Sequence, residues 1–132
     1  MIFVDTSAFY AVLDRDDDVH CAARDTWVQL VTDGIALVSS NYVLVECFAL
    51  VQARLGVAAA RAFNDAMLPV VEILWVSPED HQAAVHAVLT ANRRDLSLVD
   101  CASFQLMRRW AVRQAFAFDR HFVEQGFEII PA

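Results

Sequence analysis

The sequence predicts an α/β fold with three layers, α/β/α, in which a central parallel sheet of about five strands is covered by helices on both faces. Short apolar runs alternate with longer helical patterns along the chain, which is typical of parallel sheets. Several of these runs are continuously apolar, as expected for strands that are buried on both faces. With 132 residues, the chain is expected to form a single domain, residues 1–132, around one core.

The N-terminal half is predicted to follow the order strand, helix, helix, strand, helix, helix. An acidic run at residues 14–18 ends the first helix, and Gly34 follows the second, where glycine commonly terminates a helix. Ser39-Ser40-Asn41 opens the third helix, and Gly56 separates it from the fourth. The expected elements cover residues 2–4, 8–13, 20–31, 35–38, 41–55 and 57–68.

The C-terminal half is predicted to contain three strands and three helices. Ser77-Pro78-Glu79-Asp80 is a capping box with proline at the first helical position, and Ser97-Leu98-Val99-Asp100 is a second capping box, so each is expected to start a helix. A short helix is expected between Asp119 and Gly126. The other expected elements cover residues 70–76, 78–92, 97–111, 115–118 and 127–130.

Composition narrows the classes of function. The net charge is −7, which argues against binding nucleic acid through a broad basic face. All ten basic residues are Arg, and the absence of Lys excludes Schiff-base and P-loop chemistry. A hydrophobic content of 58% with a mean hydropathy of +0.40 predicts apolar surface that binds a partner, such as a second copy of the chain.

Cysteine usage and the N-terminus predict a cytoplasmic protein. The three Cys are an odd number without a C-x-x-C pair, as expected in a reducing compartment. The N-terminus has no basic region typical of a secretory signal, because Asp5 follows at once. The longest apolar stretch, residues 42–60, is interrupted by Glu46, Gln52 and Arg54, so no membrane association is expected.

Four isolated acids are the candidate functional residues. Asp5 and Asp119 each follow an apolar strand directly, and they meet if the first and fourth strands are neighbours where the strand order reverses. Asp100 lies in the first turn of a helix that starts on the same side. Glu46 is the only charged residue among residues 42–51, and its apolar neighbours three and four positions away predict a buried carboxylate.

Each acid also has a purely structural interpretation. Asp5 and Asp119 can cap the helices that follow them, and Asp100 occupies the third helical position of a capping box. Glu46 can face outward from the end of its helix. Against these interpretations, all four acids are expected at the same edge of the sheet.

Four carboxylates in one cleft repel one another and raise one another's pKa, a conflict that a divalent cation removes. Oxygen ligands without Cys or clustered His predict Mg²⁺ or Mn²⁺ rather than zinc. Such ions activate water and stabilise the charge on a phosphodiester. Two divalent ions would bring the net charge of −7 to −3, which is compatible with a nucleic-acid substrate.

Four motifs in this order resemble the PIN-domain pattern, and the chain length is similar to that of VapC-type toxins. The motifs are Val4-Asp5-Thr6-Ser7, Glu46 in its helix, Asp95-Leu96-Ser97-Leu98-Val99-Asp100, and Phe118-Asp119-Arg120-His121-Phe122 followed by Gly126. The resemblance implies an Mg²⁺- or Mn²⁺-dependent endoribonuclease that is the toxin of a type II toxin–antitoxin pair. It also implies an RNA substrate, a cognate antitoxin protein as inhibitor, and a homodimer.

By position, the resemblance implies that Asp5, Glu46, Asp100 and Asp119 are the catalytic and metal-binding residues. Thr6 and Ser97 match supporting hydroxyl positions. The chain departs from the pattern at Ala117, where many members have Thr or Ser, and at His121, where some have a further acid. Both departures bear on whether a second metal binds.

The remaining polar and aromatic residues receive other assignments. Arg93 and Arg94 are the predicted RNA contacts, because they are the basic residues nearest to Asp100 in sequence. The four His show no ligand spacing and are assigned structural or solvent roles, and the three Trp are assigned to the core or to an interface. The alternative function is a non-catalytic PIN-like module that binds a protein. A haloacid-dehalogenase-type phosphatase is excluded, because Ser7 replaces its second Asp and Lys is absent.

Overall fold

All five strands lie in one parallel sheet in the computed structural model, which describes residues 1–132. The strand order is β3-β2-β1-β4-β5, so β1 and β4 are neighbours, which is the condition for Asp5 and Asp119 to meet. The strands are β1 (Ile2–Val4), β2 (Leu37–Ser40), β3 (Val71–Leu74), β4 (Gln114–Phe116) and β5 (Glu128–Ile130). The chain moves outward from β1 in one direction to β2 and β3 and in the other to β4 and β5, so the order reverses at β1.

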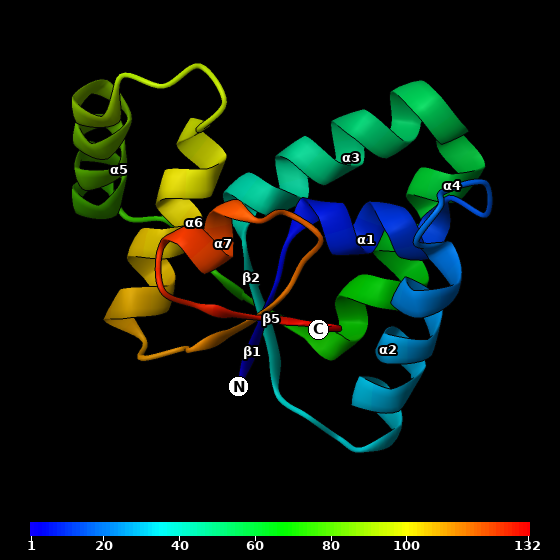
Figure 1. The fold of residues 1–132 in the computed structure, drawn as a ribbon. Helices are drawn as coiled ribbons and strands as arrows, with labels where there is room; N and C mark the ends of the chain where they lie inside the picture. The colour runs from blue at the N-terminus through cyan, green and yellow to red at the C-terminus, as the bar shows by residue number, and fades with distance from the viewer.

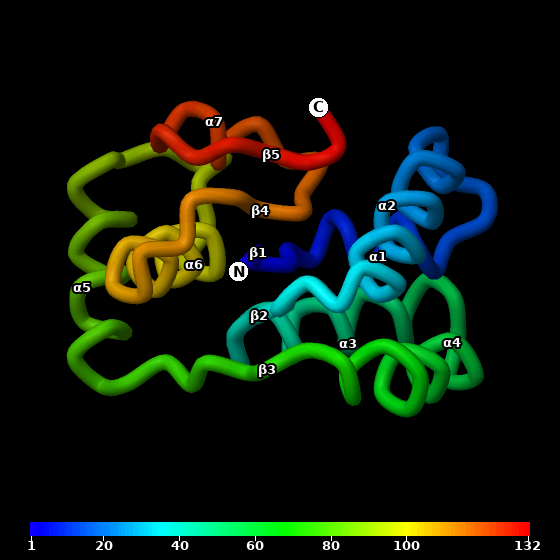
Figure 2. Tube along the Cα trace, turned by 90° about the horizontal axis from the view of Figure 1, so that it is seen from below, coloured from blue at the N-terminus to red at the C-terminus, as the bar shows by residue number.

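Helices cover both faces of the sheet (Figures 1 and 2). One face carries α6 with α5 packed outside it, and α1, α2 and α4 lie on the opposite side. This arrangement confirms the predicted α/β/α layers. The helices are α1 (Thr6–Leu13), α2 (His20–Thr32), α3 (Asn41–Leu55), α4 (Val57–Ala62), α5 (Pro78–Ala91), α6 (Leu98–Arg109) and α7 (His121–Glu124).

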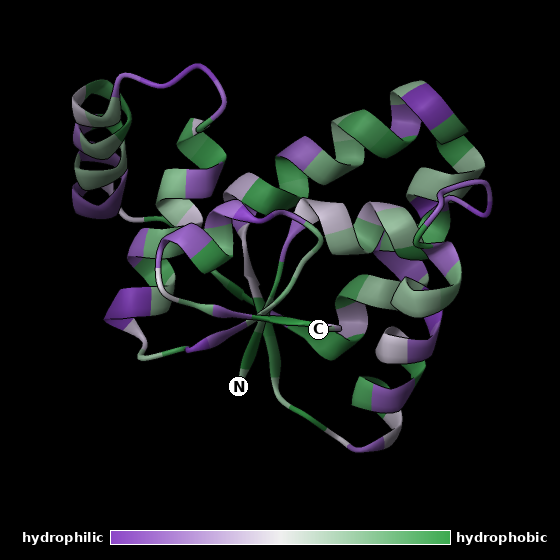
Figure 3. Cartoon of the chain, in the orientation of Figure 1, coloured by the Kyte–Doolittle hydropathy of each residue, from purple (hydrophilic) through white to green (hydrophobic).

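Aromatic side chains fill the space between the sheet and both helical layers. On the α6 face, Phe122 lies 5.1 Å from Phe104 and 6.5 Å from Phe3 between ring centroids. On the α1 face, Phe9 packs 5.0 Å from Phe63 and 6.3 Å from Trp27. Hydrophobic residues follow the strands, whereas the acidic turn after α1 and the connection between α5 and α6 are hydrophilic (Figure 3).

Several predicted elements differ from the structure in their bounds, most of all the fourth helix. The helix expected to reach residue 68 ends as α4 at Ala62 and continues as a π-helical turn, η1 (Phe63–Met67), and a 3₁₀ turn, η2 (Leu68–Val70). Pro69 has no N–H to donate and cannot continue a regular helix, so the chain leaves the helix there and enters β3. The second strand begins at Leu37 rather than Ile35.

Only one of the two predicted capping boxes is reciprocal. Ser97 and Asp100 exchange both hydrogen bonds at the start of α6. At the start of α5, Ser77 accepts the hydrogen bond from the Asp80 backbone, but the Asp80 carboxylate contacts the Arg109 guanidinium at 2.9 Å. The buried Asp80 side chain therefore ties α5 to α6.

The three tryptophans do not share one environment. Trp27 is partly buried and packs on Phe9. Trp75 and Trp110 are 73% and 53% exposed, so a core role is wrong for both, and the interface role stays a prediction.

None of the helices has the length and apolar character needed to cross a membrane.

Candidate metal centre

The carboxyl ends of β1 and β4 form the floor of the candidate site. Asp5 follows β1, and its backbone N–H donates to the carbonyl oxygen of Phe116 at the end of β4 at 3.0 Å. Asp119 follows β4 after two residues and precedes α7. The reversal of strand order therefore brings these two acids to one edge of the sheet, as the sequence predicted.

The Asp5 carboxylate is held by Ser7. Its Oδ2 accepts hydrogen bonds from the Ser7 backbone N–H at 3.1 Å and from the Ser7 hydroxyl at 2.7 Å. The same hydroxyl accepts from the Phe118 N–H at 2.9 Å, which fixes its rotation and joins the first motif to the last. Asp5 thus caps α1, as its structural interpretation proposed, and it is also close enough to Asp100 and Asp119 for their charges to raise its pKa.

Ser7 was not among the sequence-predicted site residues. The available signal was a hydroxyl two residues after an acid that ends a strand and caps a helix, the arrangement in which side chain and backbone return to the same carboxylate.

Burial is the main influence on the pKa of Asp5, a residue that is only 4% exposed. Loss of solvation raises the pKa of Asp5 to about 7, the charges of Asp100 and Asp119 raise it further, and the hydrogen bonds from Ser7 oppose the shift. Asp5 therefore keeps its proton up to about neutral pH, and a nearby cation would favour its ionised form.

Asp100 combines the capping role with a place in the site. Its Oδ2 accepts from the Ser97 N–H at 3.0 Å, and its own N–H donates to the Ser97 hydroxyl at 3.0 Å. Partial burial raises the pKa of Asp100, and the charge of Asp119 raises it as well. The capping box fixes the carboxylate at the start of α6, so the structural and functional interpretations do not exclude each other.

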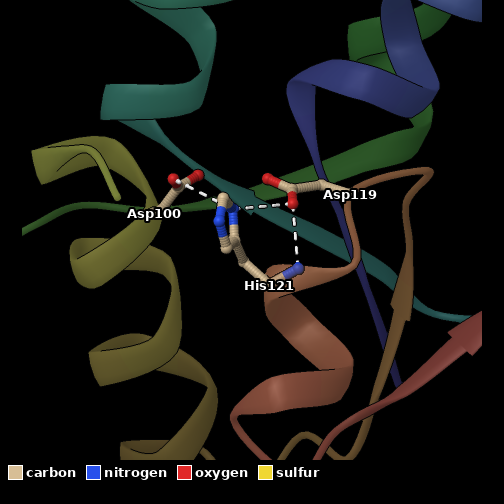
Figure 4. Close-up of side chains that lie close together, drawn as sticks. All are labelled: Asp100, Asp119 and His121. Carbon is tan, nitrogen blue, oxygen red and sulfur yellow. Dashed lines mark hydrogen bonds and ion pairs between the residues drawn. The ribbon is translucent and has the colours of Figure 1, made fainter. Parts of the chain in front are cut away.

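His121 lies between Asp100 and Asp119, although the sequence analysis assigned it a structural or solvent role (Figure 4). Its Nδ1 is 2.8 Å from Asp119 Oδ1 and 3.9 Å from Asp100 Oδ2. The Nδ1 atom is buried, yet neither contact has hydrogen-bond geometry. One ligand atom from each of the three residues lies within 4.8 Å of the others, a spacing at which they could hold a metal ion.

A second layer surrounds this group. Asp95 Oδ2 lies 3.2 Å from His121 Nε2, and the Arg93 guanidinium contacts both oxygens of Asp95 at 2.8 and 3.0 Å. The pKa of His121 is raised chiefly by Asp95, and that of Asp95 is lowered chiefly by Arg93. Arg93 also contacts Glu124 at 3.1 Å, so its guanidinium is already paired, whereas Arg94 is exposed.

The predicted burial of Glu46 is wrong, because the residue is exposed. The buried stripe of α3 runs through Val43, Cys47 and Val51 at four-residue spacing, and this spacing turns Glu46 to the side. Glu46 and Tyr42 line a pocket of about 330 Å³ together with Val99, the residue before Asp100. Glu46 thus lies beside the site but outside the group spaced for a metal.

The two predicted supporting hydroxyls have different environments. Ser97 is fully engaged in the capping box. Thr6 is 6% exposed, and its buried Oγ1 has no hydrogen-bond partner. Ala117 is fully buried in the position where a hydroxyl was expected from the PIN-domain pattern.

The donor set fits a divalent cation. Asp100 at the start of α6, Asp119 before α7 and His121 at the start of α7 are spaced to share an ion, and the His121 Nδ1 is buried without a hydrogen-bond partner. Asp5 lies outside this group, but its charge interacts with those of Asp100 and Asp119. A bound cation would neutralise the mutual repulsion and use the unpaired nitrogen. Oxygen-rich donors of this kind suit hard cations.

The fold and the acids at the carboxyl edge of the sheet are features of one protein family. The family model of the PIN domain matches residues 2–128, and the chain belongs to this family.

Individual relatives narrow the comparison further. The chain is 34% identical over 128 residues to the 23S rRNA-specific endonuclease VapC20 of Mycobacterium tuberculosis, strains CDC 1551 / Oshkosh and H37Rv, covering 96% of this chain and 95% of the relative. The crystal structure of M. tuberculosis VapC20, described as a sarcin-ricin loop cleaving toxin, superposes with a TM-score of 0.85 at 33% identity and 96% coverage of both chains.

More distant structures share the fold alone. FitAcB from Neisseria gonorrhoeae matches with a TM-score of 0.70 at 13% identity, covering 98% of this chain and 96% of the other. VapBC2 from Rickettsia felis, bound to a DNA fragment from its promoter, gives the same TM-score and identity, covering 98% of this chain and 97% of the other.

Proposed function

We propose that this protein is a divalent-metal-dependent endoribonuclease that hydrolyses RNA phosphodiesters and acts as the toxin of a type II toxin–antitoxin pair. The observation that carries the proposal is the convergence of Asp5, Asp100 and Asp119 at the carboxyl edge of the sheet. The full-length similarity to a 23S rRNA-specific endonuclease supports this activity.

The proposed metal-binding and catalytic residues are Asp5, Glu46, Asp100 and Asp119, with Mg²⁺ or Mn²⁺ as the cofactor. When bound, such an ion activates water and offsets the negative charge of the phosphodiester. Asp5 presents its free Oδ1, because Ser7 occupies Oδ2. Asp100 is held by Ser97 at the start of α6.

Glu46 has a different part from the other acids. Because it is exposed and lines the adjacent pocket, its carboxylate is free to turn toward substrate or metal without first leaving a buried partner. Arg94 is the proposed contact to the RNA backbone. Arg93 stays a second proposed contact, although Asp95 and Glu124 already pair with its guanidinium.

The proposed partners are RNA, a cognate antitoxin protein and a second copy of the chain. Exposed apolar side chains support protein partners: Val45 is 71% exposed and Phe48 is 42% exposed on α3. Both line an apolar groove of about 430 Å³ between α3 and the segment from Phe63 to Leu68.

A cleavage assay on total RNA tests this function against a non-catalytic binding module. We expect cleavage in Mn²⁺ or Mg²⁺, none in chelator, and a loss on the order of 100-fold for Asp119→Asn. Asp65→Asn, a substitution of an exposed acid away from the site, is the matched control. RNA that stays intact with folded, metal-loaded protein would favour the binding module.

A further inference from the structure

The Nδ1 edge of the His121 ring is buried and has an unusual polar environment. Its Nδ1 has no hydrogen-bond partner, although it lies 2.8 Å from Asp119 Oδ1 and 3.9 Å from Asp100 Oδ2. A buried polar atom without a partner is uncommon in folded proteins and indicates either strain or a missing ligand.

The contact at the other ring nitrogen, Nε2, determines which nitrogen carries the hydrogen in the neutral ring. Nε2 lies 3.2 Å from Asp95 Oδ2, and a carboxylate held by Arg93 can only accept, so Nε2 is the donor. In the neutral ring, Nδ1 then presents its lone pair to Asp119 Oδ1, which also carries lone pairs. Two acceptors 2.8 Å apart repel each other unless a proton or a metal ion lies between them.

Protonation gives Nδ1 a hydrogen and an ion pair with Asp119, but not a hydrogen bond of normal geometry. Asp119 Oδ1 already accepts from the His121 backbone N–H at 2.9 Å, and the ring approaches it outside hydrogen-bond geometry. A metal ion can be shared by one atom from each of Asp100, Asp119 and His121, which lie within 4.8 Å of one another.

We propose that His121 Nδ1 is a nitrogen ligand of the metal beside Asp100 and Asp119, that Asp95 is the positioning residue for this ring, and that the mixed donor set makes the site prefer Mn²⁺ to Mg²⁺. The inference rests on the proposed function for the presence of a divalent ion at this site. It replaces the all-carboxylate donor set expected from the sequence with one that includes an imidazole.

Asp95 is suited to the positioning role because it is itself fixed. Arg93 donates from Nε to Oδ1 at 3.0 Å and from Nη2 to Oδ2 at 2.8 Å, a two-point contact that sets the plane of the carboxylate. A carboxylate that accepts from the outer nitrogen of a metal-bound histidine orients the ring and raises its basicity.

The donor set decides the choice of ion. Mg²⁺ requires near-ideal octahedral geometry, almost always with oxygen ligands, whereas imidazole nitrogen suits first-row transition metals. Mn²⁺ accepts carboxylate oxygen and also follows the transition-metal preference for nitrogen. A site with Nδ1 among its ligands therefore favours Mn²⁺ over Mg²⁺.

Pulsed electron paramagnetic resonance on the Mn²⁺-loaded full-length protein detects this nitrogen directly, without reference to activity. We expect a histidine nitrogen coupling that changes when the histidines are labelled with ¹⁵N. The coupling should disappear in His121→Ala and persist in His86→Ala, a control in which an exposed histidine of α5 is removed. Circular dichroism melts in chelator establish that each variant is folded.

Calorimetric titration with Mn²⁺ alone and with Mg²⁺ alone measures the preference. We expect His121→Asp, which replaces nitrogen by oxygen, to reduce the Mn²⁺ preference over Mg²⁺ by about tenfold or more while metal still binds. Asp95→Ala should weaken Mn²⁺ binding by roughly 10- to 100-fold, and Asp95→Asn should recover part of the loss, because an amide oxygen can accept from Nε2. Glu124→Gln, which removes the other partner of Arg93, should leave Mn²⁺ binding unchanged.

The outcomes separate this inference from the proposed function. Metal-dependent RNA cleavage by Mn²⁺-loaded protein without a histidine coupling would overturn the role of His121 and leave the nuclease standing. A coupling that survives in His121→Ala would overturn it as well. Failure of the wild-type protein to bind either ion would remove both proposals together.

Discussion

Asp5 shows how one buried side chain can link stability to pH and metal. The carboxylate is covered by protein and hydrogen-bonded to Ser7, and its pKa is raised from 3.8 to about 7. The folded state therefore holds the proton more tightly than the unfolded state. The stability associated with the protonated carboxyl is fully present below about pH 4 and is lost as the pH rises through about 7.

Removing this charge should stabilise the metal-free protein. We expect Asp5→Asn in chelator to unfold at a higher temperature than the wild type near pH 8, with a free energy of unfolding larger by up to about 4 kcal/mol and a difference that vanishes toward pH 4. Thermal melts across this pH range measure the effect, and Asp65→Asn is the control for loss of an exposed charge. In saturating Mn²⁺ the order should reverse, because only the wild type gains binding energy from this carboxylate. Equal melting of both proteins at all pH values in chelator would contradict a buried, unpaired Asp5.

Ser7 is predicted to matter for both folding and metal binding. Ser7→Ala leaves the Phe118 N–H without its acceptor and frees Asp5 Oδ2 to rotate. We expect a loss of about 1–3 kcal/mol in the free energy of unfolding and weaker Mn²⁺ binding. Urea unfolding in chelator and calorimetry check the two effects. Ser7→Thr, which keeps the hydroxyl, should restore metal binding, and a Thr variant as weak as the Ala variant would argue against the hydrogen bond.

Glu46 separates folding from activity. It is exposed, and none of the ion pairs in the structure involves it. Glu46→Gln should therefore change the free energy of unfolding by no more than about 0.5 kcal/mol, while cleavage in Mn²⁺ falls steeply. Melts in chelator and cleavage rates per folded molecule provide the comparison. A variant that keeps full cleavage would end the catalytic assignment of this residue.

For the individual elements, the sequence predicts whether a segment is a helix or a strand better than it predicts which side of a helix faces the core. The run Ile2–Val4 and the capping box before α6 are local signals, and the structure contains both elements where the sequence placed them. The rotation of α3 is not local, because it depends on which stripe meets the core. Its three buried residues, Val43, Cys47 and Val51, could not be distinguished from their apolar neighbours, and Glu46 was placed inside for that reason.

The same limit applies to His121. Asp119 and His121 lie close together along the chain, and Asp100 lies far from both. The sequence does not show the orientation of α7, which directs the His121 ring toward Asp100. Ser7 and Asp95 likewise acquire their distant partners, Phe118 and His121, only when the ends of β1, β4 and α6 meet. The parallel sheet could be predicted from the alternation of strands and helices, whereas the strand order entered only as a condition and the contacts between side chains could not be predicted.

The contact between α5 and α6 gives a test at a distance from the site. Asp80 is buried and faces Arg109 at 2.9 Å. Arg109→Gln leaves that carboxylate poorly paired, and we expect a loss of about 1–3 kcal/mol in the free energy of unfolding. Adding Asp80→Asn should recover part of this loss, because the buried charge is then gone. Urea unfolding of both single variants and the double variant checks the coupling. Additive losses would show that the two side chains do not interact.

At the scale of the whole molecule, acids that repel one another lie together and form the candidate metal site. A chain with a net charge of −7 gathers acids at the carboxyl edge of a parallel sheet, where the strand order reverses. The carboxylates repel one another in this arrangement, and a divalent ion bound there would relieve the repulsion. This explains how an acidic PIN-domain protein can act on RNA without a broad basic face.

That explanation is best tested by measuring Mn²⁺ binding and RNA cleavage on the same samples. Half-maximal cleavage should occur at the Mn²⁺ concentration that half-saturates the protein in calorimetry. Asp119→Asn should lose binding and cleavage together, by about 100-fold in rate, while Asp65→Asn retains both. Cleavage that continues in chelator, or that persists at the wild-type rate in Asp119→Asn, would contradict a metal-dependent site built from these acids.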